Sequence, residues 1–231
     1  MTNWGFICNM AQYSATPCKK EDLQSLWETV FGDSRFVTDA FFAYAFDPDG
    51  CFYAERDGKA VAALYLLPVL SGDTKGFYLY AAATLPAYRG QGLMGSLIRE
   101  ALAYAEKNAQ FVYLCPAEDS LYAYYARFGF SQTLYAACYE KAVTDEISDA
   151  QQMYLYAKTL TNCPCFLPSV YRYACLIGCK MYRCGGTLFA EKAMYPSGTP
   201  QPCGSVVPYG TAITFTENCL PADWYAFLTM N

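Results

Sequence analysis

The chain has 231 residues, of which 54% are hydrophobic and 16% are charged, a composition typical of a folded globular protein and not of a disordered one. Its net charge of -5 lacks the basic footprint that nucleic-acid-binding proteins carry. No apolar run is long enough to cross a bilayer, and residues 1–10 lack the pattern of a secretory signal. We therefore expect a cytoplasmic protein with neither a nucleic-acid nor a membrane partner.

The absence of histidine narrows the chemistry that the chain can perform. It excludes Ser-His-Asp and Cys-His catalysis, and it removes histidine from any metal site. The twelve cysteines are scattered without Cys-x-x-Cys spacing, so most are interpreted as small buried hydrophobic residues, and no metal is expected. An enzyme of this composition has to move protons with Tyr, Glu, Asp, Cys, Lys, water or a chain terminus.

The first part of the chain shows helical and strand patterns up to Pro86. The expected elements, in order, are a strand at 9–15, helices at 21–31 and 35–46, and strands at 51–56, 60–69 and 77–84. Asp57-Gly58 is a strong two-residue hairpin signal, so it predicts antiparallel pairing of the strands on either side.

A glycine-rich turn, Tyr88-Arg89-Gly90-Gln91-Gly92-Leu93-Met94-Gly95, joins the last of these strands to an amphipathic helix. The first N–H groups of a helix have no partner inside the helix, and they carry the positive end of its dipole. Glycines let an anion approach these groups, and Arg89 adds a guanidinium suited to phosphate oxygens. The turn therefore predicts a phosphate-binding site.

Other interpretations of this turn fit the sequence less well. Gly90-x-Gly92-x-x-Gly95 also matches the dinucleotide fingerprint, but the next strand, at 110–115, ends without the acidic residue that would hold a ribose. A P-loop needs Gly-Lys followed by Ser or Thr, whereas Leu93 follows Gly92. A turn that only forms a tight corner remains an alternative, although Arg89 beside the glycines disfavours it.

The second part of the chain begins with an expected helix at 121–128, which ends at Gly129, and a strand at 130–141. The polar stretch 142–150 indicates a boundary, so we expect one domain at residues 1–142 and a C-terminal α/β lobe of unknown role at residues 149–231. The expected elements of the lobe are helices at 149–160 and 169–181 and strands at 187–194 and 206–215.

Arg89-x-x-Gly92 and Tyr124-Tyr125-Ala126-Arg127-Phe128-Gly129-Phe130 are two motifs that, taken together, resemble the GCN5-related N-acetyltransferase (GNAT) family. The acyl-CoA loop of that family is usually Gln/Arg-x-x-Gly-x-Gly/Ala, and here Met94 stands at the last position. The second motif is similar to the family's Phe/Tyr-Tyr-x-x-x-Gly-Phe segment. The resemblance implies a GNAT fold, which is an α/β (α+β) architecture with a mixed, mostly antiparallel sheet flanked by helices. Some bacterial members carry an extra C-terminal lobe.

The resemblance also implies a transfer of acetyl from acetyl-CoA, as co-substrate, to a primary amine of a small molecule or peptide by direct attack in a ternary complex. It implies that the pantetheine arm of acetyl-CoA pairs with the backbone at residues 82–84, and that its pyrophosphate lies on the amides of residues 90–95. The residues implied to bind the co-substrate are Ala82, Ala83, Thr84, Arg89, Gly90, Gln91, Gly92, Leu93, Met94, Gly95 and Ser120.

Acid–base roles follow from the same resemblance. Tyr125 matches the family position that gives a proton to the leaving CoA thiolate. Glu118, or else Asp119, could take the proton of the acceptor amine through water, although either carboxylate is equally a solvated loop residue. A bulge in the strand at 77–84 would free a backbone N–H that stabilises the oxyanion.

Rival classes of function remain open beside the acetyltransferase. A non-catalytic sensor that keeps the fold would bind an acyl-CoA without turning it over. A nicotinamide-dependent enzyme would bind a reduced dinucleotide and not CoA. The sequence leaves the acceptor amine unnamed, and it leaves open whether the chain forms a homodimer.

Overall fold

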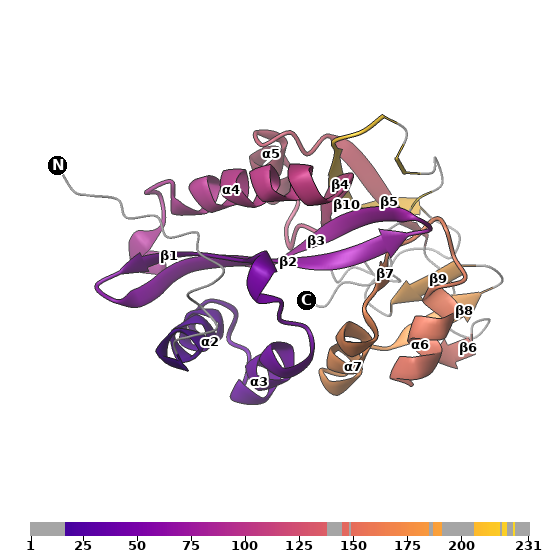
Figure 1. The fold of residues 1–231 in the computed structure, drawn as a ribbon, viewed down its shortest axis with the longest axis horizontal. Coiled ribbons are helices and arrows are strands. Elements are labelled where there is room, and N and C mark those ends of the chain that lie inside the picture. Colours follow the sequence, from indigo (N-terminus) through magenta and orange to yellow (C-terminus); the bar gives the residue numbers. More distant parts are fainter. Residues whose placement is uncertain are drawn as a thin grey trace. The chain divides into compact units, whose positions relative to one another are not determined.

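A computed structural model describes residues 17–137, 145–147, 149–184, 187–190, 206–217, 219–220 and 224 (Figure 1). The strand expected at 9–15 lies outside the described residues. The chain divides into two compact units, one made of residues 1–67 and 78–107 and the other of residues 68–77 and 108–231. We describe each unit by itself.

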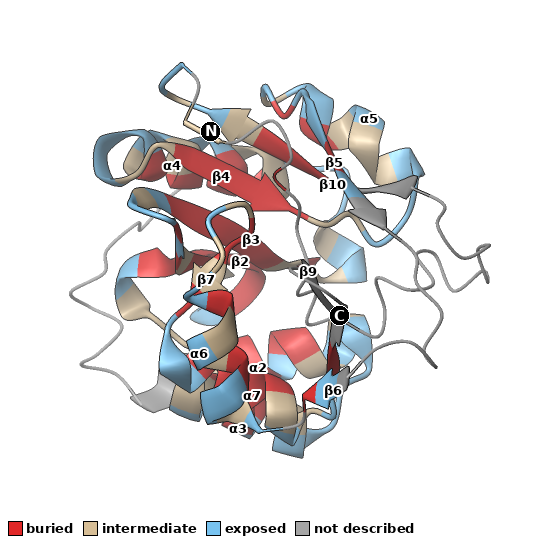
Figure 2. Ribbon diagram, turned by 90° about the vertical axis from the view of Figure 1, so that its right-hand side faces the viewer, coloured by how far each residue is buried: buried red, intermediate tan, exposed pale blue. Residues whose placement is uncertain are grey.

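The first unit contains helices and strands in the expected order. Its elements are α2 (Pro17–Phe31), α3 (Arg35–Tyr44), η1 (Pro48–Gly50), β1 (Cys51–Arg56), most of β2 (Lys59–Ser71) and of β3 (Thr74–Thr84), η2 (Pro86–Tyr88) and α4 (Leu93–Asn108). The strands of this unit lie between α4 on one face and α2 with α3 on the other (Figures 1 and 2).

The hairpin that Asp57-Gly58 predicts is present in the structure. β1 and β2 pair antiparallel from Cys51 opposite Tyr65 to Arg56 opposite Lys59. Asp57 and Gly58 have φ of 51° and 77°, and positive φ at both central residues is the signature of the type I′ turn that suits a two-residue hairpin.

Helix α4 buries the apolar face that its helical spacing predicts. The side chains on that face are buried, with an exposed fraction of 3% or less, and they are Leu93, Leu97, Ile98, Ala101 and Ala105. Burial of this stripe fixes the rotation of the helix about its axis, because turning it would bring apolar surface into water. The first turn of α4 is therefore held at the end of the glycine-rich segment.

The second unit begins with the C-terminal part of β2 and the start of β3, and it continues from residue 108. Its further elements are β4 (Phe111–Leu114), α5 (Ser120–Ala126), β5 (Gln132–Ala137), β6 (Asp145–Ile147), α6 (Ala150–Ala157), β7 (Cys165–Phe166), α7 (Pro168–Leu176), β8 (Met181–Cys184), β9 (Thr187–Ala190) and β10 (Val206–Thr214). The helix expected at 169–181 is shorter than predicted, because Gly178 has φ of 82° and Met181 begins a strand.

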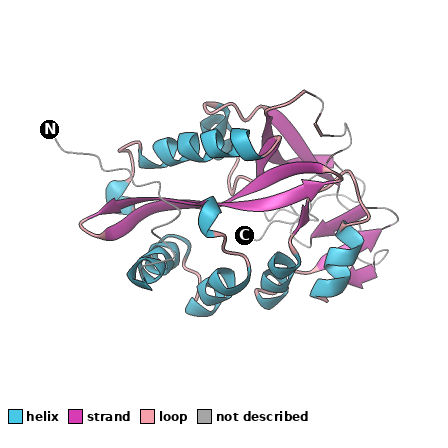
Figure 3. Ribbon diagram, viewed as in Figure 1, coloured by secondary structure: helices cyan, strands magenta, loops and turns pink. Residues whose placement is uncertain are grey.

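The main sheet has the strand order β1-β2-β3-β4-β10-β5, with β7 paired to β2. A second sheet has the order β6-β8-β9. The pairs β1–β2, β4–β10, β10–β5 and β2–β7 are all antiparallel. This mixture of helices with a mostly antiparallel sheet (Figure 3) confirms the predicted α/β fold class.

Strand β10 confirms the strand expected at 206–215, and it pairs with strands of the main sheet. It pairs with β4 from Thr211 opposite Leu114 to Thr214 opposite Phe111, and its other edge pairs with β5. The last predicted strand is therefore part of the main sheet. The division of the remaining chain at residues 142 and 149 stays a prediction.

A buried tryptophan ties residue 224 to the second unit. The indole Nε1 of Trp224 donates a hydrogen bond to Ser71 Oγ at 2.8 Å, and that hydroxyl donates to the carbonyl of Thr161 at 2.9 Å. The indole ring also meets the rings of Phe111 and Tyr113 edge-on, at centroid distances of 5.5 and 5.2 Å. Because Ser71 satisfies the buried indole N–H, the ring can be buried without losing a hydrogen bond.

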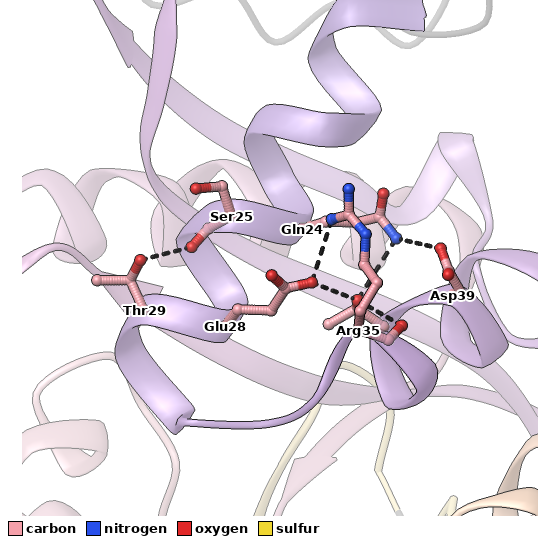
Figure 4. Close-up of polar contacts among 7 residues, drawn as sticks. Gln24, Ser25, Glu28, Thr29, Arg35 and Asp39 are labelled. Atoms are coloured by element: carbon pink, nitrogen blue, oxygen red, sulfur yellow. Dashed lines mark hydrogen bonds and ion pairs between the residues drawn. The ribbon is translucent and has the colours of Figure 1, made fainter.

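Polar side chains join α2 to α3 in the first unit (Figure 4). Gln24 Nε2 donates to Asp39 Oδ1 at 2.8 Å, and Arg35 Nη1 donates to Glu28 Oε1 at 3.1 Å. Thr38, which is fully buried, donates from Oγ1 to the same Glu28 oxygen at 2.8 Å. The bonds of Gln24 and Thr38 satisfy polar groups that burial would otherwise leave unpaired, so they help to fix the two helices to each other.

Replacing Thr38 with valine is expected to lower the free energy of unfolding by about 1–3 kcal/mol, because Glu28 loses a buried donor while the shape of the side chain is kept. The matched control is Thr29→Val, which removes an exposed hydroxyl bonded to the Ser25 carbonyl and should change stability by less than about 0.5 kcal/mol. Denaturant unfolding of both variants measures the difference. Equal effects at the two positions would show that the network does not fix the helices.

No helix among the described residues is long and apolar enough to span a bilayer.

Candidate active site

The C-terminal part of β3, the strand in which the family resemblance implies a bulge, contains a residue of unusual backbone conformation. Ala81 has φ of 49°, a left-handed conformation that costs a residue with a side chain roughly 1–2 kcal/mol. A left-handed residue inside a strand interrupts the regular ladder and turns neighbouring N–H groups away from it. Ala82 and Thr84 are half-buried, whereas Ala83 is buried.

The strand end leads into a short turn that is fixed by backbone hydrogen bonds. Leu85 N donates to the carbonyl of Val61 at 2.9 Å, and Tyr88 N donates to the carbonyl of Leu85 at 2.9 Å. Arg89 folds back, so that its Nε donates to the carbonyl of Thr84 at 3.1 Å. This bond holds the exposed guanidinium beside the end of β3.

The glycines after Arg89 leave the backbone open. Gly90 and Gly92 have φ of 75° and 77°, and no atom beyond the adjacent residues lies within 4 Å of the position that a Cβ would take on either of them. The positive φ favours glycine, whereas the packing leaves room for a side chain. Both residues are exposed, so an anion can reach their amides without moving a side chain.

The amides of this turn are available to a ligand. Within the part of the chain that the structure describes, no backbone N–H of residues 90–95 donates a hydrogen bond to a backbone carbonyl. The first N–H after the turn that does so is that of Ser96, which donates to the Gly92 carbonyl at 3.0 Å. The first turn of α4 contains no acidic residue. Its unpaired N–H groups and the helix dipole therefore present partial positive charge next to Arg89.

The segment between β4 and α5, in the second unit, contains the two carboxylates that could act as the base, Glu118 and Asp119. Glu118 and Ser120 are exposed, and Ser120 Oγ donates to Glu118 Oε2 at 3.3 Å. Asp119 is the N-cap residue of α5, although its side chain makes no capping hydrogen bond. Of the two carboxylates, Glu118 is the one held by a neighbouring hydroxyl.

Tyr125 is the buried tyrosine of α5, with 8% of its surface exposed. Its ring lies 5.3 Å from that of Tyr124 and 5.9 Å from that of Phe130. Burial, with a smaller contribution from Tyr124, raises the pKa of Tyr125 to about 12. The phenol is therefore protonated at neutral pH and can donate a proton. Helix α5 ends at Ala126, before the end expected at residue 128, and Gly129 has φ of 98° in the turn that follows the helix.

The raised pKa of Tyr125 predicts a loss of stability in alkali. Burial favours the neutral phenol, so its contribution is complete below pH 10, the ordinary pKa of tyrosine, and is lost as the pH rises toward about 12. We expect the free energy of unfolding to fall less steeply across this range in Tyr125→Phe than in the wild type. Denaturant titrations at about pH 9 and about pH 11 measure the two slopes. Identical slopes would show that Tyr125 ionises as an ordinary tyrosine.

The structure groups the predicted site residues by unit. Residues 82–84 and 89–95 lie along one continuous path in the first unit, from β3 to α4, whereas Glu118, Ser120 and Tyr125 lie in the second unit. Their roles stay predictions. The described residues contain no group of three or more side chains that could hold a metal ion.

Tyr122 is a further tyrosine of α5, and neither sequence motif includes it. It is half-buried, and the pKa of its phenol is raised to about 12, first by burial and then by Cys115 and Asp119. It precedes Tyr125 by three residues, so the two phenols lie on the same side of α5. That spacing was the signal in the sequence that could have identified it.

The fold and the strand-to-helix turn define an α/β protein with an open, positively charged corner suited to an anion. Residues 14–133, just over half of the chain, match the family model described as the acetyltransferase (GNAT) domain. The chain belongs to the GNAT acetyltransferase family, as its two motifs predict.

Solved structures of low sequence identity share the fold. A protein of Pyrococcus horikoshii assigned to the acetyltransferases has a TM-score of 0.62 at 14% identity, over 100% of this chain and 96% of that one. Eis1 from Mycobacterium abscessus has a TM-score of 0.62 at 9% identity, over 93% and 74%. A GCN5-related N-acetyltransferase from Anabaena variabilis has a TM-score of 0.53 at 13% identity, over 85% and 70%. No curated protein matches the sequence significantly.

Proposed function

We propose that the protein is an N-acetyltransferase that moves acetyl from acetyl-CoA to a primary amine of a small molecule or peptide by direct attack in a ternary complex. Membership of the GNAT family supports an acyl-CoA-dependent acetyltransferase. The observation that carries the proposal is the turn at Gly90–Gly92, whose open amides lie between Arg89 and the first turn of α4.

The residues of the turn fit the diphosphate of acetyl-CoA. The N–H groups of residues 90–95 would hold its oxygens, and the Arg89 guanidinium, held at the strand end by its bond to Thr84, would neutralise part of its charge. The small residues of β3, from Ala81 to Ala83, leave space for a chain to approach the irregular strand end. An N–H turned out of the ladder there would stabilise an oxyanion, a contribution typically worth about 10²–10³ in rate.

The second unit would supply the proton transfers. Acetyl-CoA brings the thioester, and the chain has to accept a proton from the amine and give one to the departing thiolate. Tyr125 would give that proton, because its phenol stays neutral at physiological pH. Glu118, whose carboxylate accepts from Ser120, would take the proton of the amine through water.

The experiment that tests the proposal measures release of free CoA thiol from acetyl-CoA in the presence of a panel of primary amines. We expect thiol release that depends on an amine and yields an acetylated product by mass spectrometry. Binding of acetyl-CoA without release for any amine would favour the non-catalytic sensor instead. Thermal stabilisation by a nicotinamide dinucleotide and not by CoA would favour a nicotinamide-dependent enzyme.

A further inference from the structure

A second arginine lies beside the glycine turn, on the helix side. Arg99 is exposed, and its Nη2 donates to Ser96 Oγ at 3.3 Å. Long side chains of a helix lean toward its N-terminus, and this contact carries the guanidinium toward the first turn of α4. Gly95 precedes Arg99 by four residues, so both lie on the same side of the helix.

This side of α4 is the one that faces away from the core. The buried stripe of the helix consists of Leu93, Leu97, Ile98, Ala101 and Ala105, whereas Ser96 is half-buried and Arg99 is exposed. A ligand held at the amides of residues 90–95 would therefore meet Arg99 without displacing a packed side chain. The two arginines differ in position, because Arg89 is fixed at the end of β3 and Arg99 lies in the second turn of α4.

Two separate phosphate groups on the co-substrate match these two positions. CoA carries a diphosphate and, on its ribose, a 3′-phosphomonoester with a charge of about −1.5 to −2 near neutral pH. Arg89 lies where the proposed function puts the diphosphate. We infer that Arg99 binds the 3′-phosphate, so that the protein selects CoA over 3′-dephospho-CoA. This inference rests on the proposed function, since it concerns the same co-substrate.

The test is a double-mutant-type cycle, in which the 3′-phosphate is removed from the ligand and the guanidinium is removed from the protein, each alone and both together. Calorimetry gives the dissociation constants of CoA and of 3′-dephospho-CoA for the wild type and for Arg99→Gln. We expect the wild type to prefer CoA by about tenfold, which corresponds to about 1.4 kcal/mol. In Arg99→Gln the affinity for CoA should fall by about tenfold, while the affinity for dephospho-CoA should stay unchanged because that ligand lacks the 3′-phosphate. Comparing the four dissociation constants in a double cycle isolates the contact between the guanidinium and the phosphate.

Lys107→Gln is the matched control. It removes the same charge from the exposed last turn of α4, about 12 Å further along the axis, so it reports the effect of net charge alone. We expect both affinities of this variant to stay close to those of the wild type. Arg99→Lys, which keeps the charge, should recover part of the preference for CoA and thereby exclude a folding defect as the cause.

Different failures have different meanings. If the wild type binds CoA and dephospho-CoA equally, or if Arg99→Gln weakens both by the same factor, the inference about Arg99 is wrong while the proposed function stands. If the wild type binds neither molecule, the proposed function is wrong and the inference fails with it.

Discussion

Replacing Gly92 with aspartate is expected to weaken acetyl-CoA binding by about 100-fold, which corresponds to about 2.7 kcal/mol. A carboxylate at this position would lie within a few ångströms of the bound diphosphate, and two like charges about 4 Å apart repel by about 1–4 kcal/mol at the effective dielectric constants of a protein surface. No neighbouring atom lies near the position of the new Cβ, and aspartate is among the residues that tolerate positive φ, so the variant should fold. Calorimetry measures the affinity, and thermal unfolding checks the fold.

Gly92→Asn is the matched control for charge. Asparagine has nearly the same size and the same tolerance for positive φ, so it adds the bulk of the side chain without its charge. We expect this variant to lose less than about tenfold in affinity, because a 1.4 kcal/mol difference is a factor of ten. An aspartate variant with unchanged affinity would show that the diphosphate does not lie at Gly92. Equal losses in both variants would show that space, and not charge, governs this position.

Replacing Tyr125 with phenylalanine is expected to lower kcat by about 10²–10⁴ and to leave the affinity for acetyl-CoA unchanged within about twofold. The phenol would act only when the thiolate leaves, so its loss should raise the barrier without affecting binding. The ring contacts with Tyr124 and Phe130 are kept in the variant, so its thermal stability should change little.

Tyr124→Phe provides the control, because it removes the adjacent phenol from the same helix. Its side chain is half-buried, and we expect its kcat to stay within about threefold of the wild type. Steady-state thiol release and calorimetry separate the two parameters for both variants. A Tyr125→Phe enzyme with normal kcat, or equal losses in the two variants, would show that Tyr125 serves packing and not proton transfer.

Local signals predicted most of the described elements. Asp57-Gly58 specified its hairpin because both residues adopt positive φ at low cost. The turn at residues 88–95 was predictable because glycine, arginine and a helical repeat are adjacent in the sequence. In each case the physical cause lies within a few residues of the signal.

Long-range pairing was not predictable in the same way. The apolar pattern of β10 identified a strand, but nothing in that pattern names β4 and β5 as its partners. Pairing between strands so far apart in the sequence depends on tertiary packing, and the apolar periodicity of a single strand carries no information about its partners. Helix α7 was predicted too long because its apolar spacing continues past Gly178, where the positive φ ends the helix.

The motifs of the candidate site were predictable from the sequence, whereas the hydrogen bonds and the burial of its side chains were not. The sequence identified Arg89 and Tyr125, but the bond from Arg89 to the Thr84 carbonyl and the burial that raises the pKa of Tyr125 depend on the folded chain. The contact between Arg99 and Ser96 follows a three-residue spacing that the sequence contains, although the motifs gave no reason to examine it.

Titration of the wild-type protein with acetyl-CoA in a calorimeter, repeated with Gly92→Asp, tests most directly whether the amides beside Gly92 bind a diphosphate. The account predicts saturable binding of one acetyl-CoA per chain by the wild type, and none by Gly92→Asp at the same concentrations. Absence of binding by a folded wild-type protein, or equal binding by the two proteins, would contradict it.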